Sequence, residues 1–187
     1  MEDALLPAIR EALGDLAESA SDSVAPIRFV GDVAKIAWSL PDRILFKKID
    51  AFLKAVPEGK REEFARRAEN DPGLSKKIGE HLILALDQMD DLEKAEIHGK
   101  VFVAYVAGSI GIETLRRLGA AINAGYITDI KHIYTSTDSI LEPFLSSLLR
   151  SGLSQPTGPK FGKVATYELS PLGKIFQQLM RDEPITA

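Results

Sequence analysis

Apolar side chains recur every three or four residues along most of this 187-residue chain. This spacing places them on one face of an α-helix, where they can be buried together. No segment before Ala124 shows the alternating pattern of a β-strand. The sequence therefore predicts a mostly α protein whose main part is a helical bundle. The clearest stripe consists of Leu45, Phe46, Ile49, Phe52, Leu53 and Val56.

Prolines, glycines and capping residues divide the chain into helices. Pro57 ends one helix, the pair Asp71-Pro72 begins another, and the segment 107–111 separates helices expected at Leu92–Gly108 and Ile112–Ala124. Further helices are expected at 27–39, 58–69, 128–134 and 138–150. The predicted organisation is an N-terminal amphipathic helix and linker (1–24), a helical bundle (25–125) and a C-terminal module (126–187).

The C-terminal module contains the single β-hairpin that the sequence predicts. From Leu148 to Phe176 the pattern is a helix end, a glycine turn, two short strands and a second helix. Gly158, Pro159 and Gly162 supply the turn between the strands. Ser170 followed by Pro171 is typical of a helix N-cap and first turn.

This part of the chain, roughly residues 128–182, resembles the winged-helix fold. The resemblance rests on two motifs, formed by Leu149, Gly152 and Leu153 and by Tyr167, Leu169, Ser170, Leu172 and Gly173. It implies a recognition helix at 138–150, a wing at Gln155–Lys163 and a surface of the kind that many family members use to contact DNA.

The residues on that surface favour protein contact over DNA reading. From Thr128 onward there are six bases and six acids, whereas DNA binding needs an excess of lysine and arginine. The expected recognition helix also exposes serines instead of the amide groups that read bases. We therefore expect a non-enzymatic interaction or regulatory protein that contacts another protein or a second copy of itself, and a DNA-binding transcriptional regulator is the alternative. The residues predicted to make the contact are Ser146, Ser147, Arg150, Lys160, Phe161 and Lys163.

An acidic segment in the bundle gives a third hypothesis. Six acids lie between Glu80 and Glu96, and Asp87, Asp90 and Asp91 are carboxylates of the type that bind divalent cations. The same residues could instead end one helix and cap the next. Residues 41–125 also resemble the TerB-like helical domains, which implies metal binding in stress or phage defence, although Asp90-Asp91 stands where an Asp-Gly pair is expected.

The remaining features point away from catalysis and membranes. The chain has no cysteine and three histidines, His81, His98 and His132, without a zinc-binding pair. We therefore expect no enzyme activity, no cofactor and no small-molecule substrate. His98 is the histidine expected to approach the acidic segment. A net charge of −4, together with acids directly after Met1, predicts a cytoplasmic protein without membrane attachment.

Overall fold

The computed structural model describes residues 43–136, 140–157 and 166–182, and the predicted helices at the N-terminus lie outside this part. The described chain is mostly helical with one two-stranded hairpin near its C-terminal end, which confirms the predicted fold class. The elements are α3 (Arg43–Ala55), α4 (Glu58–Asn70), α5 (Pro72–Gln88), α6 (Leu92–Val106), α7 (Ile112–Ala124), α8 (Ile127–Thr135), α9 (Glu142–Ser147), the 3-10 helix η1 (Leu148–Ser151), β1 (Ser154–Thr157), β2 (Thr166–Leu169) and α10 (Pro171–Met180). The winged-helix and TerB-like resemblances stay predictions.

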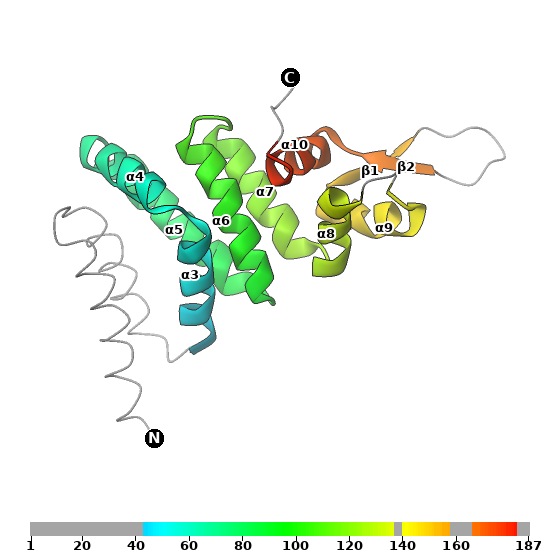
Figure 1. Ribbon diagram of the computed structural model, residues 1–187, viewed down its shortest axis with the longest axis horizontal. Helices are drawn as coiled ribbons and strands as arrows, with labels where there is room; N and C mark the ends of the chain where they lie inside the picture. Colours follow the sequence, from blue (N-terminus) through cyan, green and yellow to red (C-terminus); the bar gives the residue numbers. More distant parts are fainter. Residues whose placement is uncertain (1–42, 137–139, 158–165, 183–187) are drawn as a thin grey trace.

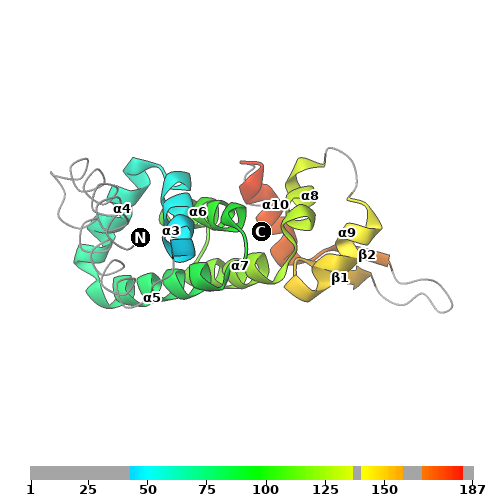
Figure 2. The same cartoon turned by 90° about the horizontal axis from the view of Figure 1, so that it is seen from below.

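The molecule is elongated, with α4 and α5 at one end and the hairpin at the other (Figure 1). The two views agree that α6 and α7 form the middle and that α10 lies between them and α8 (Figure 2). We refer to α8 through α10 as the C-terminal module. Its helix α10 packs against α6, α7 and α8. The buried side chains consequently form one cluster that runs from Leu45 in α3 to Phe176 in α10. No helix of the described residues is both long enough and apolar enough to cross a lipid bilayer.

Helix starts follow the capping residues in the sequence. Asp91 accepts a hydrogen bond from the backbone N–H of Glu93 at 2.8 Å and so caps α6. Ser170 caps α10 by accepting from the N–H of Gly173 at 3.0 Å. Both interactions satisfy donors that have no partner within the helix itself. The acidic segment therefore separates two helices, which is one of the two readings that its sequence allowed.

Two buried lysines cap the C-terminal ends of helices other than their own. The Nζ of Lys48 donates to the carbonyl oxygen of Asp87 at the end of α5, at 2.8 Å. The Nζ of Lys94, whose residue is only 2% exposed, donates to the carbonyl of Asn123 near the end of α7, at 3.0 Å. The last carbonyls of a helix lack intrahelical donors and carry partial negative charge, so a cation there is stabilising. These lysines therefore fasten α3 to α5 and α6 to α7.

The hairpin pairs Ser154 with Leu169 and Thr157 with Thr166 in antiparallel register. It is preceded by Gly152, whose φ of 76° ends η1 in the left-handed conformation that glycine adopts most easily. The backbone then enters β1. The turn predicted at Gly158, Pro159 and Gly162 lies outside the described residues.

The predicted helix at 138–150 is wrong at both ends. Residues 140 and 141 are not helical, α9 begins at Glu142, and the predicted end of the helix is the 3-10 helix η1, Leu148–Ser151. Pro143 explains the late start, because its ring would clash with the carbonyl of residue 139 in a longer helix. Within α9 it lies in the first turn, where a missing N–H costs nothing.

Candidate functional site

The α9–η1 segment carries the described residues that the sequence predicts to contact a partner. Ser146, Ser147 and Arg150 lie within five consecutive positions, and Ser147 and Arg150 are exposed. Ser146 donates its hydroxyl to the carbonyl of Pro143 at 2.9 Å. Ser147 donates to the carboxylate of Asp129 in α8, which holds the start of α8 against the end of α9. The other predicted contacts, Lys160, Phe161 and Lys163, lie outside the described residues.

Apolar side chains accompany these polar residues on the surface. Leu141, directly before α9, is 64% exposed, and Leu149 in η1 is 37% exposed. Residues 142, 146, 149 and 150 follow helical spacing, so their side chains share one face. We call Leu141, Glu142, Pro143, Ser146, Leu149 and Arg150 the α9 surface. Tyr126, which directly precedes α8, is 74% exposed. The hydrogen bond between Asp129 and Ser147 places the start of α8 near the end of α9.

The exposure of Leu141 and Leu149 was not predicted from the sequence. Leu149 was treated as part of a fold motif, and Leu141 was expected to lie inside a helix. The leucines at 141, 145, 148 and 149 have the spacing of one apolar helix face, so the sequence pattern gave no signal of this exposure. Leu145 and Leu148 are buried, and the other two are left exposed.

Two basic side chains of the C-terminal module have partners within the protein. Lys131 forms an ion pair with Glu93 of α6 at 2.7 Å, and this contact raises the pKa of Lys131. Arg181 donates to the carbonyl oxygens of Tyr134 and Ser136 at the end of α8, at 3.3 and 2.5 Å. Lys131 therefore connects the module to α6, and Arg181 satisfies carbonyl groups at the end of α8, the first helix of the module. Both bases are positioned for internal contacts and not for phosphate groups.

The structure does not bring Asp87, Asp90 and Asp91 together. The carboxylate of Asp90 pairs with Lys94 at 2.6 Å, and this hydrogen bond is the main reason that the pKa of Asp90 is lowered. Asp91 caps α6, and the backbone carbonyl of Asp87 accepts from Lys48. Among the residues that the structure describes, no three histidine or carboxylate side chains form a group that could hold a metal ion.

His98 does not approach the acidic segment as expected. It is completely buried in the middle of α6, because α6 packs against α3, α4, α7 and α10 and is covered on nearly all sides. Burial lowers the pKa of His98 to about 4, and the nearby His81 contributes in the same direction. The ring is therefore neutral at physiological pH. The apolar run 101–106 was the sequence signal, since a helix that is apolar all round is buried.

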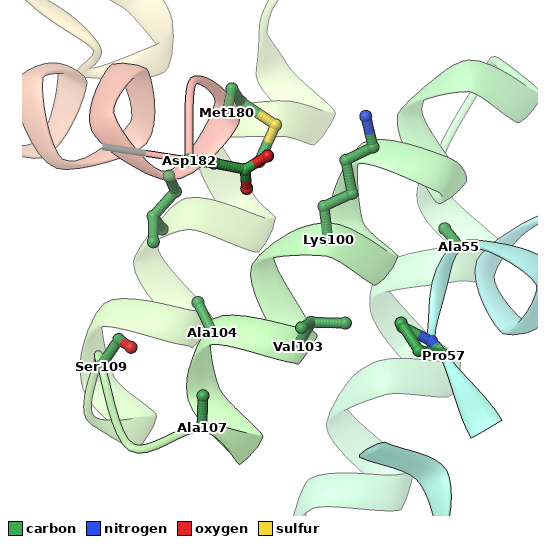
Figure 3. Close-up of a pocket in the computed structure, with 10 residues that line it drawn as sticks. Ala55, Pro57, Lys100, Val103, Ala104, Ala107, Ser109, Met180 and Asp182 are labelled. Atoms are coloured by element: carbon green, nitrogen blue, oxygen red, sulfur yellow. The ribbon is translucent and has the colours of Figure 1, made fainter. Parts of the chain in front are cut away.

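A pocket of about 650 Å³ lies where the end of α10 meets α6 and the α3–α4 connection. Ala55, Val103, Ala104 and Ala107 contribute apolar atoms to it. Lys100 projects from α6, Asp182 follows α10, and Ser109 comes from the α6–α7 turn (Figure 3). The turn joins two helices, as the segment 107–111 predicted, and no strand precedes Ser109. This geometry lacks the strand–turn–helix that would present a serine nucleophile.

Comparison of the chain with protein-family models, curated proteins and solved structures found no match.

Proposed function

We propose that this protein is a non-enzymatic interaction protein that contacts a protein partner through the α9 surface. One observation carries the proposal: Leu141 and Leu149 are exposed on a short helical segment whose charges, Glu142 and Arg150, cancel. Exposed apolar side chains that are rimmed by polar residues are a feature of protein interfaces. Contact with a protein would remove the apolar area of both leucines from water. A charged phosphate backbone has no apolar surface that could bury them.

Charge also supports a protein partner over DNA. The described part of the C-terminal module holds four bases, Lys131, Arg150, Lys174 and Arg181, of which Lys131 and Arg181 have the internal partners described above. Two dispersed cations neutralise few phosphates, and phosphate neutralisation dominates DNA affinity. The α9 surface also lacks the Asn and Gln side chains that read adenine.

The experiment compares the wild type with two variants of equal chemistry. Leu141→Ser combined with Leu149→Ser removes the apolar part of the α9 surface. Leu84→Ser is the matched control, because Leu84 is 61% exposed on α5, in a different part of the molecule. Both variants should unfold within about 0.5 kcal/mol of the wild type, as exposed substitutions usually do.

Binding is measured by affinity capture with quantitative mass spectrometry and by light scattering of the purified protein. We expect a partner, or the self-associated form, to be lost with the α9 variant and kept with Leu84→Ser. Equal binding by all three proteins would remove the α9 surface from the proposal. A gel-shift assay on random DNA at about 50 mM salt, where phosphate contacts are strongest, distinguishes the regulator alternative. A shift that persists in the leucine variant and disappears in Arg150→Glu would favour DNA.

A further inference from the structure

His98 of α6 is enclosed between α3 and α7 at the centre of the bundle. Its ring packs against Phe52 of α3, with the two ring centroids 5.9 Å apart and tilted by 42°. On α7 the ring lies against Gly119, where an added Cβ atom would come within 2.8 Å of Cε1 of His98. Glycine is a poor helix former, so its presence inside α7 is explained by the space that the imidazole needs.

Neither ring nitrogen of His98 has a hydrogen-bond partner among the described residues. This is uncommon, because buried polar groups are usually bonded. His81 of α5 also has a buried Nε2 without a partner. Burying a neutral imidazole without hydrogen bonds costs free energy. Burying a protonated imidazole costs much more, because it has two N–H donors and a charge.

The charged groups around His98 do not compensate for a proton on it. His81 of α5 opposes a positive charge on His98. Arg116 of α7 opposes a positive charge on His81. Lys94, one turn earlier on α6, is engaged with Asp90 and with the Asn123 carbonyl. From α3 the neighbour is the apolar ring of Phe52.

We propose that His98, with His81 beside it, makes the helical bundle acid-sensitive. A proton taken up by the His98 ring places an unpaired charge in the core, and α3, α6 and α7 must separate before water can reach it. Because α10 packs on α6 and α7, this opening also loosens the attachment of the C-terminal module.

The direction of the pH dependence follows from the buried site. The pKa of His98 falls from 6.5 to about 4 in the folded protein, so the unfolded chain binds the proton more tightly. The stability that the neutral ring contributes is complete above pH 6.5 and is lost as the pH falls toward 4. A difference of about 2.5 pH units corresponds to a folding equilibrium constant roughly 300-fold lower at acidic pH. Burial lowers the pKa of His81 as well, which adds a loss in the same direction.

Urea unfolding followed by circular dichroism between pH 4 and 8 tests the proposal on three proteins. These are the wild type, His98→Leu, and His132→Gln as the control. His132 is also a histidine in contact with an aromatic ring, stacked on Phe144 at 3.8 Å, but it is only partly buried. Between pH 7.5 and 4 the folding constant of the wild type should fall roughly 150-fold more than that of His98→Leu, because half of the folded rings are protonated at pH 4. His132→Gln should retain the wild-type slope. Parallel curves for the wild type and His98→Leu would overturn the proposal.

A second measurement does not depend on the variant being able to fold. In the wild type, nuclear magnetic resonance of the imidazole ring should show His98 neutral at pH 5 while the protein is still folded. After correction for the slower intrinsic exchange of amide hydrogens at low pH, the protection factors of the α6 amides should be lower at pH 5 than at pH 7. A titration midpoint near 6.5 for His98 in the folded protein would refute the inference, since it would require a ring that is hydrated or paired.

Discussion

Replacing Gly173 with alanine should destabilise the protein by about 2 to 4 kcal/mol, because α10 passes too close to the start of β1 for a side chain. A Cβ atom at this position would lie 1.9 Å from the carbonyl oxygen of Leu153 and 2.9 Å from its carbonyl carbon. Both contacts are with backbone, so no side-chain rotation can relieve them. The helix must move away by about 1.5 Å to reach an ordinary contact distance, and misfits of this kind cost about 1 to 3 kcal/mol.

The movement also breaks a hydrogen bond. The N–H of Ser170 donates to the same Leu153 carbonyl at 3.0 Å, and losing such a bond in a buried place adds about 1 kcal/mol. Phe176, which is 0% exposed one turn further along α10, would lose packing as well. For a chain of this length the total corresponds to a melting temperature lower by about 10 °C.

Urea denaturation and thermal melting, both followed by circular dichroism at 222 nm, measure this effect. Gly59→Ala is the matched control, because an added Cβ there has no atom within 4 Å and α4 is an exposed helix. That variant should be as stable as the wild type or more stable, by up to about 1 kcal/mol. If Gly173→Ala unfolded at the same urea concentration as Gly59→Ala, the close approach of α10 to β1 would be incorrect.

Two further changes test contacts on which the helix ends depend. Ser170→Ala removes the N-cap of α10, which accepts from Gly173, and should cost about 1 to 2 kcal/mol in urea unfolding; an unchanged midpoint would mean that water replaces the cap. Lys94→Ala should cost more than Lys94→Met in the same assay, by about 1 to 2 kcal/mol. Both variants lose the contacts to Asp90 and Asn123, but methionine still fills the buried space, so equal losses would show that the charge alone matters.

Local signals in the sequence predicted much of the fold correctly. The pair Asp71-Pro72, the cap at Asp91 and the Ser170-Pro171 step each depend on neighbouring residues only, and each helix begins where they indicate. The hairpin also lies where turn residues separate two short strands. These features could be predicted because capping and turn formation are short-range interactions.

The errors concern effects that act over longer distances. A helix at 138–150 satisfied the apolar pattern, but the steric effect of Pro143 moved its start to Glu142. Lys48 and Lys94 reach helix ends 39 and 29 residues away, which no local pattern in the sequence indicates. His98 was placed near acids because they are close in sequence, whereas its surroundings come from α3 and α7. None of these partners can be identified before the helices are packed.

Because the core is continuous, the hairpin end of this protein depends on the helical bundle for its folding. Leu148, Leu153 and Phe176 share one apolar interior with Val101 and Leu118, so no seam separates the two ends of the molecule. Recombination that transplanted α8 through α10 alone into another protein would expose side chains of η1 and α10 that α6 and α7 now cover. We therefore expect the hairpin end to be inherited together with α6 and α7.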